Sequence, residues 1–199
     1  MEKSEKVLAM VSELYKNSST ELGKWMWNNH VQWVANKARN LAEKYNADIE
    51  KVYCAALLHD LGDTTFPRGH DDFDTWSEDK GKEILLNAGL NSEETKEIIE
   101  TIVRPHSCRP GNLPTTQEGK ILATADAMFH IQTNFFPMFC YKHRPEHTSS
   151  YEEWQDWFDQ KIERDFKSKI FFEDEKEEAR KNYEALSKVF LNKTLNSNE

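Results

Sequence analysis

Two histidines and two aspartates in this 199-residue sequence have the residue types and the order of a metal centre. His30 stands in WNNHVQWV, His59 and Asp60 are adjacent in AALLHDLGD, and Asp126 stands in ATADAMFH. Imidazole and carboxylate together are ligands that suit Mn, Fe, Co, Ni or Zn. A divalent ion held by them would lower the pKa of a bound water and polarise an oxygen of a substrate.

Helical periodicity predicts that these four side chains face the protein interior. The patterns indicate helices over residues 22–45, 48–61 and 116–130. Each candidate ligand shares a face with apolar or small residues: Val34, Ala38 and Leu41 for His30, Val52, Ala55 and Ala56 for His59, and Leu122 and Phe129 for Asp126. Three helices are therefore expected to point metal-binding groups inward.

Each of these residues also has a simpler explanation when it is taken alone. A histidine on an apolar stripe is more often a hydrogen-bonded core residue, and an aspartate near a helix end is more often a cap. Two carboxylates on apolar faces, however, would each cost several kcal/mol without a partner. A shared cation explains all four residues at once, but from the residues alone both explanations remain open.

The same residues resemble the signature of the HD-domain superfamily, over about residues 25–130. That signature is a helical histidine, then a His-Asp pair, then a distant aspartate. The resemblance implies a helical core in which His30, His59, Asp60 and Asp126 bind one divalent transition metal. It also implies a metal-dependent phosphohydrolase that cleaves a phosphoester or phosphoanhydride of a small phosphorylated substrate, with nucleotides among the candidates.

One position departs from a common form of the motif. Many small members have HD-x-G-K, whereas this chain has HDLGD, with Asp63 in place of the lysine. An acid here is closer to the His-Asp-x-x-Glu-Asp pattern of guanosine-tetraphosphate hydrolases, although Thr64 replaces the second acid, and it weakens an assignment to the cyclic-dinucleotide phosphodiesterases. Asp63 is therefore a candidate catalytic base or water-orienting group. A helix-cap role or an ion pair with Arg68 is the alternative.

His106 closes an apolar stripe at the end of its predicted helix. HD proteins often have a histidine near the metal at this point, so the resemblance implies a second catalytic candidate that holds the substrate phosphate or supports the metal. The alternative is a loop histidine beside Pro105.

Two other functions remain open. An HD-type di-iron oxygenase would need about two more histidines, for which His70 and His106 are available. The interval from His59 to His70 is short for that pattern, so a second metal is not expected. A non-catalytic, metal-stabilised regulatory domain is also compatible with the sequence, although the complete ligand set and Asp63 count against it.

Four basic residues near the motif ends are candidates for binding the substrate phosphate: Arg68, Arg104, Arg109 and Lys120. Arginine suits phosphate because its planar fork donates two hydrogen bonds at once. Taken alone, each is more often a solvated surface charge.

Composition limits the partners. The formal net charge is -9 and no basic stripe is visible, which argues against extended nucleic acid. No apolar run approaches the roughly 20 residues that span a bilayer. The segment MEKSEKVLAM lacks the apolar core of a signal peptide, and three cysteines without C-x-x-C spacing argue against a disulfide framework. We expect a cytoplasmic protein without a membrane partner.

The whole chain is expected to form one all-α HD-type domain over residues 1–199. The motif-bearing core spans about 22–130. Additional helices follow within about 150–192, and the patterns place them over residues 151–166 and 173–192. Gly62 is expected to cap the helix over 48–61, and Gly89 to separate two further helices.

Overall fold

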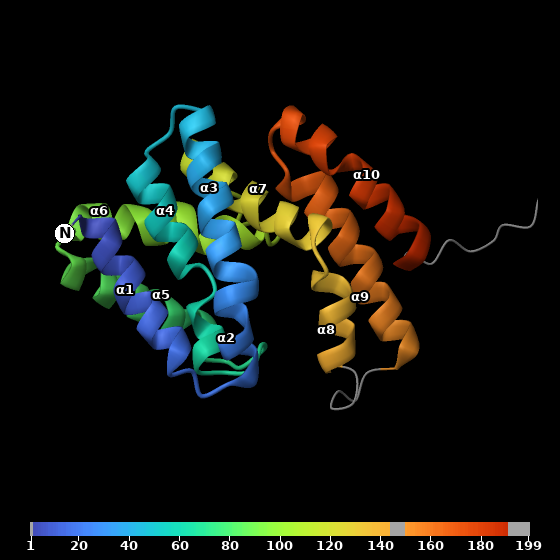
Figure 1. Cartoon of the computed structure of the whole chain (residues 1–199), viewed down its shortest axis with the longest axis horizontal. Helices are drawn as coiled ribbons and strands as arrows, with labels where there is room; N and C mark the ends of the chain where they lie inside the picture. The colour runs from blue at the N-terminus through green and yellow to red at the C-terminus, as the bar shows by residue number, and fades with distance from the viewer. Residues whose placement is uncertain (1, 144–149, 191–199) are drawn as a thin grey trace, which may run out of the picture. The chain divides into compact units, whose positions relative to one another are not determined.

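The computed structural model describes residues 2–143 and 150–190. Within these ranges the regular structure is helical, with no β-strand beyond one isolated bridge between Arg109 and Asn112 (Figure 1). The predicted all-α class is confirmed. The α-helices are α1 (Lys3–Lys16), α2 (Glu21–Met26), α3 (Gln32–Lys44), α4 (Ile49–Leu58), α5 (Phe73–Ala88), α6 (Ser92–Glu97), α7 (Gln117–Gln132), α8 (Phe135–His143), α9 (Tyr151–Arg164) and α10 (Glu173–Phe190).

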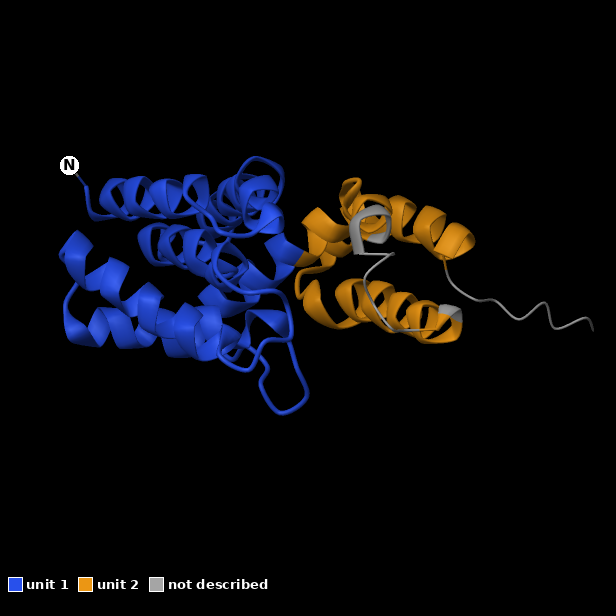
Figure 2. Cartoon of the chain, turned by 90° about the horizontal axis from the view of Figure 1, so that it is seen from below, with its two compact units in different colours: residues 1–126 blue, residues 127–199 orange. Residues whose placement is uncertain are grey.

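The chain divides into two compact units, Met1–Asp126 and Ala127–Glu199 (Figure 2). All four candidate metal ligands belong to the first unit. That the chain is a single domain stays a prediction.

In the first unit, α4 is the central helix. It packs against α1, α3 and the π-helical segment Ile98–Val103. Its residues Cys54–Leu58 are all buried, as are Val34, Ala38 and Leu41 on the facing side of α3. Because the last turns of α4 are buried on every side, the residues that follow them also lie in the interior. These residues are the pair His59 and Asp60.

The end of α4 differs from the sequence prediction. The helix stops at Leu58, with His59 as its C-cap, and a short 3-10 helix covers Leu61–Thr64. Gly62 is not the predicted cap. Instead, Gly62 lets α5 pack closely against the 3-10 helix, because a Cβ at this position would lie 2.7 Å from the Phe73 ring and from Ser77 Oγ. Gly89 does end α5, in the left-handed conformation with φ of 97°.

The second unit is built around aromatic residues and one buried charge cluster. Phe136, Phe158 and Phe166 are buried, and the Phe166 ring stacks on Tyr183 with centroids 4.0 Å apart. The fully buried Asp165 lies 3.0 Å from His130 Nδ1 and pairs with Lys161. The helices predicted over 151–166 and 173–192 are observed as α9 and α10, and residues 191 and 192 lie outside the described ranges.

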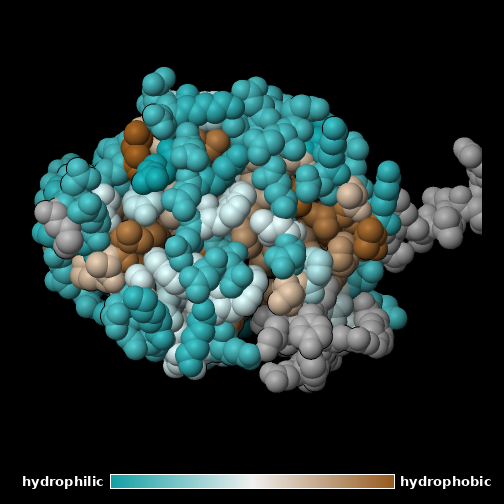
Figure 3. Space-filling model, in the orientation of Figure 1, coloured by the Kyte–Doolittle hydropathy of each residue, from teal (hydrophilic) through white to brown (hydrophobic). Residues whose placement is uncertain are grey.

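The face drawn in Figure 3 is largely hydrophilic, with smaller hydrophobic patches. None of the helices in the described part of the chain combines the length and the apolar character needed to cross a bilayer.

Candidate metal centre

His30 lies in a π-helical turn, Trp27–Val31, between α2 and α3. The helix predicted over 22–45 is thus continuous but contains an extra residue in this turn. Single π turns inside α-helices occur often at functional sites. The His30 side chain is fully buried and points from this turn into the first unit.

Asp60 is fixed by a residue that sequence reasoning missed. The hydroxyl of Tyr15 donates to the backbone carbonyl of Asp60 at 2.9 Å, and the Tyr15 ring is fully buried and stacks on Trp27. Val7, Val11 and Tyr15 are the buried residues of α1, and this spacing could have marked Tyr15 as a core residue, but nothing in the sequence indicated its partner. The HD turn is therefore held from α1 as well as from α4.

The carboxylates of Asp60 and Asp126 both lie close to the paired Nε2 atoms of His30 and His59. His30 Nε2 and His59 Nε2 are 2.9 Å apart. Asp60 Oδ2 lies 3.1 Å from the first and 3.4 Å from the second. Asp126 Oδ1, which comes from α7, lies 3.5 Å and 3.9 Å from the same two nitrogens. All four residues are buried.

The protonation of these groups suits a cation. The Nδ1–H of His59 donates to the Ala56 carbonyl at 2.7 Å, so the Nε2 of the neutral ring carries a lone pair. Burial lowers the pKa of His30 from 6.5 to about 4, which keeps this imidazole neutral. Burial opposes ionisation of Asp60, but Arg68 and then His59 hold its pKa well below the usual range. His30, His59 and Asp60 therefore form one group that could hold a divalent metal ion, and Asp126 lies beside its two histidine nitrogens.

Asp63 is paired with Arg68, the arrangement that the sequence left as an alternative. Its carboxylate has no exposed surface. It accepts from Arg68 Nε at 2.9 Å and from Arg68 Nη2 at 2.5 Å. The same Nη2 donates to Asp60 Oδ2 at 2.8 Å. Arg68 thus bridges Asp63 and a candidate ligand, while the predicted role of Asp63 as a base stays a prediction.

His106 lies beside the four residues. Its ring meets the His59 ring edge-on with centroids 5.2 Å apart, and its Nε2 is 4.0 Å from Asp60 Oδ1. Its Nδ1–H donates to the Val103 carbonyl at 2.6 Å, which leaves Nε2 as the acceptor nitrogen of the neutral ring. Its predicted phosphate role stays a prediction.

The other predicted phosphate residues have different surroundings. Arg104 forms a two-point pair with Glu78, and Arg109 pairs with Asp74 at 2.6 Å; both arginines are exposed. Lys120 is half-buried on α7. His70, the extra histidine of the oxygenase alternative, stacks on Phe66 with centroids 4.6 Å apart in an exposed loop.

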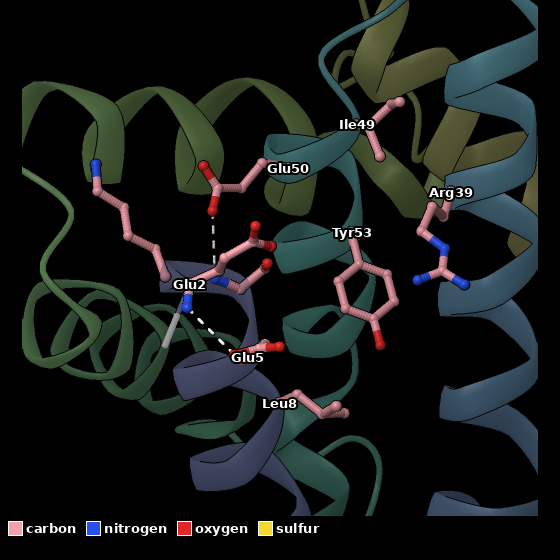
Figure 4. Close-up of a pocket in the computed structure, with 9 residues that line it drawn as sticks. Glu2, Glu5, Leu8, Arg39, Ile49, Glu50 and Tyr53 are labelled. Carbon is pink, nitrogen blue, oxygen red and sulfur yellow. Dashed lines mark hydrogen bonds between the residues drawn. The ribbon is translucent and has the colours of Figure 1, made fainter.

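A separate cavity of about 770 Å³ lies between the starts of α1 and α4 and the side of α3 (Figure 4). Arg39 and Tyr53 face it, with the guanidinium 5.3 Å from the ring centroid. None of the predicted site residues lines this cavity.

Comparisons with known proteins show the family and the fold. The HD domain family matches residues 28–129. The structure of Bacillus subtilis YpgQ in complex with ADP is similar to this one, with a TM-score of 0.65 and 21% identity over 94% of this chain and 90% of that chain. The selenomethionine form of YpgQ gives a TM-score of 0.64 at 21% identity, over 94% and 89% of the two chains. At this identity the likeness shows the fold. No curated protein matches in sequence.

Proposed function

Because the chain belongs to the HD-domain family, we propose that it is a metal-dependent phosphohydrolase whose metal is held by His30, His59, Asp60 and Asp126. Members of this family are typically hydrolases of this kind. The observation that carries the proposal is the 2.9 Å approach of two buried imidazole nitrogens, with two carboxylate oxygens within 3.9 Å of them.

A divalent cation in this position would activate a water and polarise a phosphoryl oxygen. The chain's own residues keep the ligand set ready. The Ala56 carbonyl fixes the tautomer of His59, and the Tyr15 hydroxyl fixes the backbone at Asp60. Since His30 stays neutral and Asp60 stays ionised, both are in the form that binds a cation.

The proposed substrate is a small phosphorylated molecule, with a nucleoside phosphate as the first candidate. Two observations support it: the ADP bound by the structural relative YpgQ, and the net charge of -9, which disfavours extended nucleic acid. His106, whose Nε2 lies 4.0 Å from Asp60 Oδ1, is proposed to contact the substrate phosphate. Because a phosphate oxygen accepts hydrogen bonds, this contact requires a protonated Nε2 or a bridging water.

Two alternatives are less well supported. A di-iron oxygenase would need further histidine ligands, and His70 stacks instead on Phe66 in an exposed loop. A non-catalytic metal-stabilised domain would share the ligands but release no product.

One experiment separates these functions. Protein loaded with Mn²⁺ or Co²⁺ is incubated without oxygen with nucleotides and simple phosphoesters, and released phosphate and pyrophosphate are measured. We expect turnover, and we expect Asp60→Asn to lose both turnover and bound metal. Asp79→Asn, at an exposed aspartate on α5, serves as the matched control. Strict dependence on iron and oxygen would favour the oxygenase, and binding without turnover the regulatory domain.

A further inference from the structure

We propose that Asp63 is the anchor of Arg68, and that Arg68 binds a phosphate group of the substrate beside the metal centre. This inference rests on the proposed function. It gives Asp63 a positioning role and makes Arg68 the residue that contacts the substrate.

The position of Asp63 is fixed by its backbone. Its N–H donates to the Asp60 carbonyl at 3.1 Å, and its own carbonyl accepts from the Thr20 hydroxyl at the start of α2. A Cβ at Gly23 would lie 2.6 Å from the same carbonyl, so only glycine allows α2 to come this close. The backbone at Asp63 is therefore held close against α2, which restricts the positions that the Asp63 carboxylate can take.

Both oxygens of the Asp63 carboxylate face Arg68. The two hydrogen bonds that they accept fix the orientation of the planar guanidinium. Nε and Nη2 each donate to one oxygen of Asp63, and the second hydrogen of Nη2 reaches Asp60 Oδ2. The Phe73 ring lies against the guanidinium, with its centroid 6.0 Å from Arg68 Cζ. A two-point pair between arginine and carboxylate fixes direction as well as charge.

One side of Arg68 remains available for a ligand. A guanidinium carries five N–H donors, of which the two carboxylates use three. In the part of the chain that the structure describes, the two N–H groups of Nη1 have no protein partner. The Arg68 side chain is 42% exposed, whereas the side chain of Asp63 is fully enclosed. An incoming anion can therefore reach Arg68, while a water does not reach the carboxylate of Asp63.

Charge balance gives a reason for this arrangement. When ionised, Asp60, Asp63 and Asp126 carry three negative charges, whereas a histidine that binds a metal through its lone pair carries none. A divalent cation alone would leave the centre negative and repel a phosphate. Arg68 supplies the missing positive charge at the exposed side, so the loaded centre is neutral overall and presents a phosphate-binding fork.

The test measures binding of ADP to protein loaded with Mn²⁺, by calorimetry, alongside bound metal and turnover. Arg68→Gln should weaken ADP binding about tenfold to a hundredfold, the range for charge-assisted hydrogen bonds. Arg68→Lys should recover part of the affinity, because it restores the charge without the fork. Asp63→Asn should weaken ADP binding by a similar factor, and Asp63→Asn with Arg68→Gln should be no worse than either alone.

The double variant also guards against misfolding, since neither Asp63 nor Arg68 is left charged without the other. In the Mn²⁺-loaded protein used for the test, the metal would remain as the counter-charge of Asp60. Arg180→Gln is the matched control, because Arg180 also pairs with a carboxylate and lies over an aromatic ring, in α10. It should leave ADP binding unchanged.

Two results would overturn the inference: unchanged ADP affinity in Arg68→Gln, or an Asp63→Asn variant that binds ADP normally but loses turnover by the factor of about 10²–10⁴ typical of a general base. Wild-type protein that binds ADP through Arg68 without turning it over would instead contradict the proposed function and support the inference.

Discussion

The hydroxyl of Tyr15 on α1 is bonded to the backbone carbonyl of Asp60, 45 residues later in the chain. Burial, followed by the negative charges of Asp60 and Asp63, raises the pKa of Tyr15 well above its ordinary value, so the hydroxyl remains a donor. One hydrogen bond thus ties the first helix to the centre of the HD motif.

Removing this bond should loosen the motif without opening a cavity. Tyr15→Phe keeps the ring and removes one of the two hydrogen bonds that the Asp60 carbonyl accepts, the other coming from the Asp63 N–H. The net loss of one such bond costs about 0.5–1.5 kcal/mol. We expect a lower free energy of unfolding in urea and weaker Mn²⁺ binding. Tyr53→Phe, at a half-buried tyrosine that faces the cavity of Figure 4, is the control. Equal stability of Tyr15→Phe and wild type would show that the bond does not hold the turn.

Metal removal should destabilise the protein if the four side chains are ligands. A ligand that binds only the folded state at a hundredfold excess over its Kd contributes about 2.7 kcal/mol. We expect the melting temperature to rise when Mn²⁺ or Co²⁺ is added to chelator-treated protein, and Asp126→Asn to abolish that rise. A metal response that survives in Asp126→Asn would remove this residue from the ligand set, provided that Asp79→Asn responds as wild type.

His30 should remain uncharged in mildly acidic solution. Burial lowers its pKa in the folded chain to about 4, from 6.5 for an ordinary histidine. Between these two values only the unfolded chain is protonated at this residue. The stability contributed by neutral His30 is therefore present above this window and is lost as the pH falls through it.

Nuclear magnetic resonance of labelled histidines in metal-free protein can follow this titration directly. We expect His30 in the folded protein to be largely unprotonated at about pH 5, whereas the urea-unfolded chain should titrate near the ordinary value. A midpoint at or above that value in the folded protein would contradict the proposed environment of the ring.

Asp165 should be important for the stability of the second unit. It is fully buried and is shared by His130 and Lys161. Removing one partner of a buried ion pair typically costs about 3–5 kcal/mol, because the remaining charge loses its counter-charge. We expect Asp165→Ala to unfold at markedly lower urea concentration, while Glu177→Gln, at an exposed pair, should change little. A small effect of Asp165→Ala on stability would mean that solvation of the Lys161 ammonium replaces the lost ion pair.

The sequence predicted the helical class well because helical periodicity is a local property. The inward faces of His30 and Asp126 followed from their apolar neighbours, and both side chains are buried. The predicted end of α4 was wrong because Gly62 looked like a helix cap. Its actual role, leaving room for the Phe73 ring, depends on a residue eleven positions away. The helix α8 was not predicted; Pro137 lies in its first turn, where proline is tolerated.

The connections around the candidate site were harder to predict, because they depend on long-range contacts. Nothing local indicates that Tyr15 reaches Asp60 or that Thr20 reaches the carbonyl of Asp63. The pair of Asp63 and Arg68 could be anticipated as an alternative because only five positions separate them. The contact from Arg68 to Asp60 depends on how the loop folds back, which periodicity does not describe.

The π turn at Trp27–Val31 sets the rotational phase between two parts of one continuous helix. Each residue of an α-helix advances the chain by about 100° around the axis and about 1.5 Å along it. Deleting one residue from this turn would favour regular helix and would swing α2 and everything before it by that amount relative to α3. Thr20 and Tyr15 would then no longer meet the turn at Asp60 to Thr64. Insertions and deletions in these five residues should therefore be far less tolerated than substitutions on their outer side.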